Sequence, residues 1–232
     1  MDVSVVVPAL NEEKRIQQCL CAIRSQNTKL KYEIIVCDGN SRDKTVKIAE
    51  EYADRVVISK QGLAFQRNTG ANEGTGKYIL FVDADTLILP DYFKNAMQKF
   101  RSEKNLVGLT AGFVFSKRIP KLIVAENVTN LYYTIRDKLG IGVLLGFDLM
   151  VQRKAFEKVN GFRPVPLEDW DLSYRLKKFG KIRYYTNFYV VTSSRRLESA
   201  GVWGTTKYYL DLFLSLKNIR RKDFVYKISE QR

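Results

Sequence analysis

The chain has 232 residues, of which 45% are apolar, enough for one substantial hydrophobic core. It contains no histidine, which excludes Ser-His-Asp and Cys-His nucleophile arrangements and histidine metal sites. Acid–base chemistry must therefore fall to Asp, Glu, Lys or Tyr. The three cysteines, Cys19, Cys21 and Cys37, form an odd set without zinc-type spacing, which predicts buried or free thiols in a reducing compartment.

The net charge of +14 is unevenly distributed along the chain. Residues 1–115 carry 16 Lys and Arg against 14 Asp and Glu, whereas residues 116–232 carry 23 against 11. A solvated basic surface is the ordinary explanation. The functional alternative is attraction to phosphorylated substrates or anionic lipid, which we favour over nucleic acid because the basic residues are scattered and no nucleic-acid module is present.

Nothing in the sequence divides the chain or anchors it across a membrane. No Pro/Gly/Ser-rich linker is present, so we expect a single domain, 1–232, with lobes at 1–115 and 116–232. Met1 leads directly into a strand-like run rather than a signal peptide. No apolar run approaches the roughly 20 residues of a membrane span. We therefore expect a cytoplasmic protein, with peripheral contact at the cytoplasmic membrane face left open.

Strand and helix patterns alternate along the first half of the chain. The expected strands are Val3–Val7, Glu33–Cys37, Arg55–Ile58 and Tyr78–Val82, and the expected helices run from an N-cap at Asn11 through Ile16, Leu20 and Ile23, then over Thr45–Tyr52 and Gln61–Glu73. Strands separated by helices of this length indicate right-handed βαβ units. The sequence therefore predicts an α/β fold with a mainly parallel sheet.

Polar residues follow three of the expected strands. They are the segments 8–13 and 38–45, and the acid pair Asp83 and Asp85. The loops after parallel strands share one edge of a sheet, so these side chains should converge. Two carboxylates spaced i, i+2 at a strand end suit a hard cation such as Mg²⁺ or Mn²⁺. A P-loop NTPase and a dinucleotide-binding dehydrogenase are both disfavoured, because neither glycine-rich signature follows the first strand.

Five motifs in order carry a family resemblance. The series VVVPALNEE, DGNSRDKT, GLAFQRNTGA, DADT and LEDWDL, spanning residues 3 to about 200, resembles the family 2 glycosyltransferases. These are inverting enzymes with the GT-A fold, which has a Rossmann-like central sheet flanked by helices and a C-terminal acceptor-side region. The resemblance implies a UDP- or GDP-sugar donor, a hydroxyl acceptor on a glycan or a lipid-linked glycan precursor, and Mg²⁺ or Mn²⁺ as cofactor.

The resemblance also implies roles for individual residues on the donor side. The matching positions are Pro8, Ala9, Glu12, Asp38, Arg67, Asn68, Asp83 and Ala84. Glu12 would accept hydrogen bonds from a ribose hydroxyl, and Asp38 from a nucleobase N–H. Asp83 would contact the ribose or the metal, and Asp85 would bind the metal on the diphosphate. A turn at Asp38, with Ser41 or Asp43 capping the next helix, and an exposed helix face at Asn68 are the ordinary alternatives.

The acids Glu168 and Asp169 match the family's catalytic motif before a helix. By that match, Asp169 would remove the proton from the acceptor hydroxyl as it attacks the anomeric carbon. The alternative is that acids in the first turn of a helix simply complement its dipole. Asp171 fits a helix-surface residue better than a base.

The C-terminal half is expected to contact the acceptor. A strand over Gly146–Gln152 would place Gly146-Phe147-Asp148 beside the acceptor or donor sugar, and the pair Arg195 and Arg196 would lie over the diphosphate or face solvent. Trp203–Ile219 has a helical pattern that is apolar around most of its circumference. It is suited to core burial, a homo-oligomer contact or a peripheral membrane contact, and Ile119–Leu145 could shape the same apolar wall.

Several alternatives remain open. Many GT-A enzymes complete the metal site with a C-terminal histidine, which this chain lacks. A retaining GT-A enzyme and a polyprenyl-phosphate sugar synthase would keep the fold and change the chemistry. A nucleotide-sugar-binding protein without turnover is the alternative from another class. A nucleotidyltransferase is disfavoured by the acidic first loop. The sugar, the nucleobase and the acceptor are not identified by the sequence.

Overall fold

The computed structural model describes residues 1–195, 197 and 198. The elements in chain order are β1 (Val3–Ala9), α1 (Ile16–Arg24), β2 (Tyr32–Asp38), α2 (Thr45–Tyr52), β3 (Arg55–Ile58), α3 (Leu63–Glu73), β4 (Tyr78–Val82), β5 (Thr86–Ile88), α4 (Tyr92–Ser102), β6 (Leu106–Phe115), α5 (Pro120–Lys138), β7 (Asp148–Gln152), α6 (Arg153–Lys158), α7 (Glu168–Leu176) and β8 (Lys181–Thr192). Arg196 and the predicted helix Trp203–Ile219 lie outside the described residues, so the oligomer and membrane contacts expected of that helix stay predictions.

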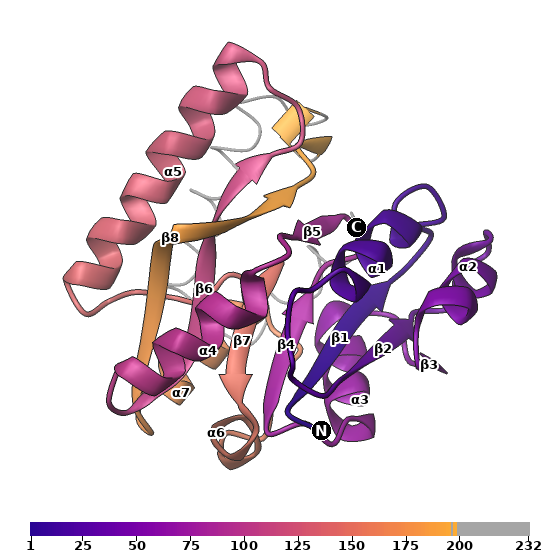
Figure 1. Cartoon of the computed structure of the whole chain (residues 1–232), viewed down its shortest axis with the longest axis horizontal. Coiled ribbons are helices and arrows are strands. Elements are labelled where there is room, and N and C mark those ends of the chain that lie inside the picture. Colours follow the sequence, from indigo (N-terminus) through magenta and orange to yellow (C-terminus); the bar gives the residue numbers. More distant parts are fainter. Residues whose placement is uncertain (196, 199–232) are drawn as a thin grey trace.

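All eight of these strands form one sheet in the order β3-β2-β1-β4-β7-β6-β8-β5 (Figure 1). The first four are parallel. β7 runs antiparallel to both β4 and β6, β6 is parallel to β8, and β5 is antiparallel to β8. The predicted α/β class is confirmed. The parallel order belongs to the first half of the sheet, and the second half is mixed.

Helices cover both faces of the parallel half. Val3, Val5 and Val7 of β1 lie in a core cluster with residues of α1 and α4, whereas Val6 points to the opposite cluster with residues of α3, α6 and α7. Burial on both faces explains why these strands are continuous apolar runs. The polar side chains are left to the edges, where the strands begin and end.

Most predicted elements match the structure, and two helix starts were placed too early. α1 begins at Ile16, because Asn11 adopts a left-handed φ of 54° and its Oδ1 accepts the Arg42 N–H (2.8 Å) instead of capping a helix. α3 begins at Leu63, after Gly62 turns the chain with a φ of 123°. The three cysteines are free thiols, as predicted.

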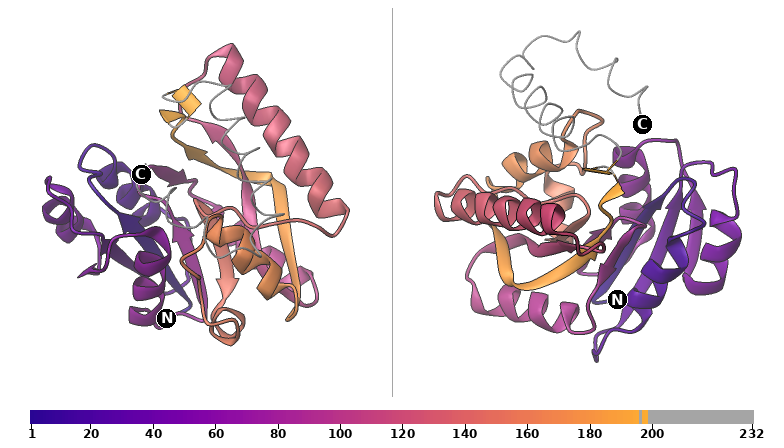
Figure 2. Two further views of the ribbon diagram at one scale, coloured as in Figure 1. Left: turned by 180° about the vertical axis from the view of Figure 1, so that it is seen from behind. Right: turned by 90° about the horizontal axis from the view of Figure 1, so that it is seen from above.

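α5 lies on the flank of the molecule, at the end opposite β3 and α2 (Figures 1 and 2). Its inner face is fixed to β6, because Glu126 accepts the Phe115 N–H (2.7 Å) and the Asn130 amide pairs with the main chain of Phe113 (2.8 and 3.1 Å). Within the described part of the chain, none of the helices is both long and apolar enough to cross a membrane.

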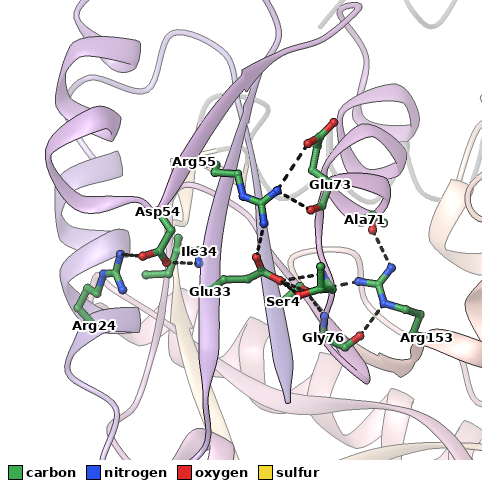
Figure 3. A network of polar contacts seen from close by, with 11 residues as sticks. Ser4, Arg24, Glu33, Ile34, Asp54, Arg55, Ala71, Glu73, Gly76 and Arg153 are labelled. Carbon is green, nitrogen blue, oxygen red and sulfur yellow. Dashed lines mark hydrogen bonds and ion pairs between the residues drawn. The ribbon is translucent and has the colours of Figure 1, made fainter. Parts of the chain in front are cut away.

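A polar network around the buried Ser4 and Glu33 joins the amino-end side of the sheet to the loop after α3 (Figure 3). Glu33 accepts hydrogen bonds from the Ser4 hydroxyl (2.9 Å), from the N–H and hydroxyl of Thr75 (2.7 and 3.0 Å) and from Arg55 (2.7 Å). These donors lower the pKa of Glu33 although burial opposes the shift. We call these four residues the Glu33 network. It is fully paired and holds β1, β2 and β3 to the start of β4.

Candidate active site

The loops that follow β1 and β2 are bonded to each other at the carboxyl edge of the sheet. The Glu12 N–H donates to the Thr45 hydroxyl (2.8 Å), and the Asn11 N–H donates to the Ser41 hydroxyl (2.8 Å). Below them, the end of β1 is fixed by the carbonyl of Ala9, which accepts the Gly39 N–H (2.9 Å). The sequence-predicted residues Pro8, Ala9, Glu12 and Asp38 are thereby brought to one edge.

Asp38 is buried and serves the turn after β2. Its Oδ2 accepts the Ser41 N–H (2.7 Å), and its Oδ1 accepts the Ser41 hydroxyl. The N–H of Thr45, at the start of α2, donates to Asp43 Oδ1 (2.9 Å). The structure therefore shows the turn, and Asp43 bonds to the first residue of α2, although Lys44 at the N-cap position makes no side-chain capping bond. Recognition of a nucleobase by Asp38 stays a prediction.

The acids at the end of β4 contact different arginines. Asp83 Oδ1 accepts a bond from Arg67 Nη2 (2.9 Å), whereas Asp85 Oδ2 lies 3.3 Å from Arg195 Nη2. Ala84 between them is buried in the core, so the two carboxylates flank it at the edge. Burial and the neighbouring charge of Asp83 raise the pKa of Asp85 to about 6, although Arg195 opposes the shift. The positive charge near Asp85 does not compensate for its burial and for the negative charge of Asp83.

Arg195 links Glu12, in the loop after β1, to Asp85, the residue predicted to bind the metal. Its guanidinium pairs with both oxygens of Glu12, at 3.2 Å on one side, and also reaches Asp85. Arg15 adds a longer contact with Glu12 (3.5 Å). A hollow of about 100 Å³ opens beside Asp85, lined by Arg15, Gln18, Ser116 and Ser193 among others. Glu12 and Asp85 are therefore close enough for the single Arg195 guanidinium to contact both.

Arg67 is the centre of the site, and it is 2% exposed. Its guanidinium donates to Asp83 (2.9 Å), to Glu168 Oε1 (3.0 Å) and to the Gly146 carbonyl (2.8 Å). Burial lowers its pKa, but the charges of Asp83, Glu168 and Asp169 outweigh that effect and raise it. One buried cation thus joins the loop after β4 to the start of α7.

α7 begins at a strained residue. Leu167 has a left-handed backbone (φ 53°, ψ 52°), which a bulky side chain seldom adopts and which costs about 1–3 kcal/mol. Its carbonyl accepts the N–H groups of Trp170 (3.0 Å) and Asp171 (3.0 Å). The left-handed turn at Leu167 sets the residue at which α7 begins, and the acids of its first turn follow directly.

Asp169 is held by backbone donors and not by an arginine. Its Oδ2 accepts the Gly146 N–H (2.9 Å), and its Oδ1 accepts the Trp170 N–H (2.9 Å). Burial and the charge of Glu168 raise its pKa to about 6, against the opposing effects of Arg67 and these bonds. Asp171 pairs instead with Arg175 (2.6 Å), which confirms the helix-surface prediction for Asp171.

Two predicted contacts look different in the structure. Asn68 is half-buried, and its amide is bonded within the chain: its Nδ2 donates to the Phe162 carbonyl (2.8 Å) and its Oδ1 accepts the Phe162 N–H (2.9 Å). Its contact with a nucleotide stays a prediction. The expectation that Asp148 touches a sugar is wrong, because this carboxylate is fully buried and bonds to Tyr92 and the Ala111 N–H (2.8 Å).

Comparison with known proteins assigns the chain to a family. Residues 4–159 match the family described as "Glycosyl transferase family 2". The chain belongs to this family. It is therefore an enzyme of the transferase type, and the resemblance stated from the sequence motifs is confirmed.

The curated relatives are longer proteins. Glycosyltransferase AglE of Haloferax volcanii is 40% identical over 91 residues, which are 36% of this chain and 30% of AglE. Glycosyltransferase GlyA of Streptococcus pneumoniae is 35% identical over 103 residues, which are 42% of this chain and 15% of GlyA. The matched part of this family 2 chain thus spans less than a third of either relative.

Two solved structures share its GT-A fold. The mannosyltransferase PcManGT from Pyrobaculum calidifontis, in complex with GDP-Man and Mn²⁺, has a TM-score of 0.71 and 20% identity, covering 95% of this chain and 65% of its own. TarS 1–349 of S. aureus, in complex with UDP-GlcNAc, has a TM-score of 0.63 and 22% identity, covering 83% of this chain and 58% of its own.

Sequence reasoning missed the part played by the backbone of Gly146. Its carbonyl accepts from Arg67 and its N–H donates to Asp169. A Cβ built on Gly146 would lie 2.8 Å from Arg67 Nη2, so a larger residue here would displace the Arg67 guanidinium. The glycine before Phe147 was the available signal, but nothing in the sequence indicates which side chains a backbone group will meet.

Proposed function

We propose that this chain transfers a sugar from a UDP- or GDP-sugar to a hydroxyl acceptor with inversion at the anomeric carbon, assisted by Mg²⁺ or Mn²⁺. Membership of the family supports the reaction class. The complexes of PcManGT with GDP-Man and Mn²⁺ and of TarS with UDP-GlcNAc support a nucleotide-sugar donor and a divalent metal. The acid edge of the sheet supplies side chains suited to both.

One observation supports Asp169 as the base among the three acids in the first turn of α7. Glu168 pairs with Arg67, and Asp171 pairs with Arg175. Among the described residues, Asp169 alone of the three has no ion pair and is positioned by two backbone N–H groups. A carboxylate held in place but not neutralised, with its pKa raised, is suited to accept a proton.

The donor set at Asp85 fits a hard divalent cation. Mg²⁺ and Mn²⁺ prefer oxygen ligands and leave positions that phosphate oxygens fill. No three His, Cys, Asp or Glu side chains converge in the part of the chain that the structure describes, so Asp85 and Asp83 would share the metal with the diphosphate. When bound, the metal would neutralise the departing diphosphate as a Lewis acid.

Arg195 would exchange partners when the donor binds. It now neutralises Glu12 and Asp85 together. A metal at Asp85 would release the guanidinium toward the diphosphate, and Glu12 would then accept a ribose hydroxyl. The Arg195 side chain is half-exposed, so its guanidinium can leave Glu12 and Asp85 from the solvent side.

In the transfer step, Asp169 accepts the proton of the acceptor hydroxyl while that oxygen forms a bond to the anomeric carbon. The bond from this carbon to the phosphate oxygen breaks, and the nucleoside diphosphate leaves with the electron pair. Attack from the face opposite the leaving group inverts the configuration. Arg67 keeps Asp83 and Glu168 paired, so that Asp169 remains the acid free to react.

The test compares two neighbouring acids on α7. Wild type, Asp169→Asn and Asp171→Asn are assayed with UDP- and GDP-sugars and Mn²⁺, with acceptor panels, and the product anomer is read by NMR. We expect Asp169→Asn to lower kcat by about 10²–10⁴-fold and Asp171→Asn to retain activity. Equal loss in both variants, or a retained anomeric configuration, would contradict the proposal.

A further inference from the structure

The outward face of α5 carries an apolar stripe. Val124, Val128, Leu131 and Ile135 are exposed to 62, 61, 60 and 48% and are spaced by four, three and four residues, so they share one face of the helix. A surface helix normally turns its apolar face inward and its charged face to water. In α5, the buried side already packs on β6 and β8, and the outer side is apolar as well.

The charges around this stripe are of one sign. Every exposed residue between positions 116 and 141 is apolar, basic or uncharged. The two acids of the segment turn inward: Glu126 accepts from the Phe115 N–H and Arg118, and Asp137 accepts the Tyr184 N–H (3.2 Å). Lys121 and Lys138 are exposed at the two ends of the helix.

This distribution disfavours a second copy of the chain as the partner. An antiparallel pairing of two α5 helices would bring Lys121 of one copy near Lys138 of the other, and a parallel pairing would oppose identical lysines. Neither arrangement offers an exposed acid from α5 to pair with them. The complementary surface must combine an apolar layer with negative charge.

We propose that α5 docks in the interface of an anionic lipid bilayer, with the stripe at the headgroup–acyl boundary and Lys121 and Lys138 at the lipid phosphates. An in-plane helix with an apolar face and flanking lysines has the chemistry that such interfaces bind. Lysine stems extend along the apolar layer while their ammonium groups stay at the phosphate level.

α5 also contacts α7, the helix that carries the proposed base. Arg136 of α5 stacks on the ring of Trp170 at 4.7 Å, and Trp170 follows Asp169 in the sequence. If the proposed function holds, an acceptor carried by a lipid would reach the base from this side. The docking itself does not depend on that function.

The experiment is flotation of the full chain with vesicles of phosphatidylcholine alone or with one-quarter phosphatidylglycerol, without donor or metal. We expect binding to the anionic vesicles only. Val128→Glu/Leu131→Glu should reduce the partition coefficient at least tenfold. Lys121→Glu/Lys138→Glu should also reduce it at least tenfold, since each basic residue near an anionic surface contributes about fivefold.

Matched variants control for the chemistry of each substitution. Ile58→Glu, at a 57% exposed position on β3 at the other end of the molecule, and Lys29→Glu/Lys31→Glu, at exposed positions before β2, should leave binding unchanged. Unfolding curves and sedimentation of every variant are measured alongside.

Four outcomes would overturn the proposal. Wild type that does not bind anionic vesicles has no such contact. Binding that survives Val128→Glu/Leu131→Glu arises elsewhere in the chain. A dimer that these substitutions dissociate makes the stripe a contact between copies. A fall in stability as large as that of a core substitution shows that the stripe is covered within the chain. Loss of transfer activity in any of these variants bears on the proposed function and not on docking.

Discussion

Opposite edges of one sheet use carboxylates and arginines to opposite effect. At the amino-end side, Glu33 is surrounded by hydrogen-bond donors from Ser4, Thr75 and Arg55 (Figure 3). At the carboxyl edge, Asp85 shares one half-exposed arginine with Glu12, and Asp169 has only backbone donors. The pKa of Glu33 is lowered, whereas those of Asp85 and Asp169 are raised.

This is the difference that we expect between an acid that stabilises the fold and the acids to which we assign the proposed function. A carboxylate that accepts enough hydrogen bonds stabilises the folded chain, because these bonds favour its charged form and offset the cost of burying the charge. A buried carboxylate with too few donors destabilises the fold in its charged form, and a cation or a proton relieves that cost. The residue type alone therefore does not show whether a buried carboxylate stabilises the fold; its hydrogen-bond donors must be known as well.

Arg67 carries the largest effect that we expect on stability. Arg67→Met would leave Asp83 and Glu168 without their shared cation, and breaking a buried ion pair from one side costs about 3–5 kcal/mol. Arg55→Met is the matched change at the Glu33 network, where the arginine side chain is 43% exposed, and should cost about 1 kcal/mol or less. Urea unfolding measures both.

Equal losses in Arg67→Met and Arg55→Met would contradict the contrast between the edges. If Arg67→Met does not fold, Arg67→Lys tests the same contrast with a smaller loss in the free energy of unfolding. A single ammonium cannot replace the three bonds to Asp83, Glu168 and Gly146, so stability should again fall more than in Arg55→Lys.

Neutralising one acid at each edge should change stability in opposite directions. Asp85→Asn removes a carboxylate whose pKa burial raises to about 6 and should increase the free energy of unfolding at pH 8 by about 1–3 kcal/mol. Glu33→Gln removes a charged acceptor and should decrease it by about 1–3 kcal/mol. Thermal and urea unfolding at pH 8 compare them, and changes of equal sign would refute the difference.

The pH dependence gives the same contrast. Asp85 binds its proton more tightly in the folded chain, so its contribution to stability falls as pH rises from about 4 to about 6 and is constant above. Glu33, whose pKa is lowered, contributes stability above its unfolded pKa and loses it as pH falls through the folded value. Subtracting the curve of each variant from that of wild type isolates these slopes, and slopes of the same sign would contradict the pKa directions.

Arg195 carries the smallest expected effect and tests the exchange of partners. Arg195→Ala should bind Mn²⁺ alone a few-fold more tightly, because Asp85 loses a competing cation, and should bind a nucleoside diphosphate more weakly. Titration calorimetry of the two ligands separates these effects. A parallel weakening of both would mean that Arg195 positions the acids without competing for them.

The sequence allowed the carboxyl edge to be located because its chemistry is local. Strand–loop–helix patterns placed Asp83 and Asp85 at the end of a buried strand, and the structure has them after β4. The alternating pattern could not show that β7 runs against both neighbours, since strand direction depends on distant pairing. Nor could it show Arg67 as the buried centre, because its partners lie 16 and 101 residues away.

The sequence did not predict the role of Glu33 at the amino-end side or the exposed face of α5, for different reasons. Glu33 sits inside an apolar strand and carries no motif, so only the donors from Ser4 and Thr75 reveal its role. In α5, apolar residues recur on the buried and the outer side, so periodicity indicated an apolar wall without saying which face was free. Asn11 was misread as a cap because its amide bonds to Arg42, which lies in another loop.

The most direct test of the acid edge as a donor site is calorimetric titration of GDP and UDP, with and without Mn²⁺. Wild type, Asp85→Asn and Glu33→Gln are compared, with folding confirmed at the same temperature. We expect one nucleotide to bind with Mn²⁺ to wild type and to Glu33→Gln, and at least tenfold more weakly to Asp85→Asn. Binding of neither nucleotide to folded wild type, or undiminished metal-dependent binding to Asp85→Asn, would contradict a donor site at this edge.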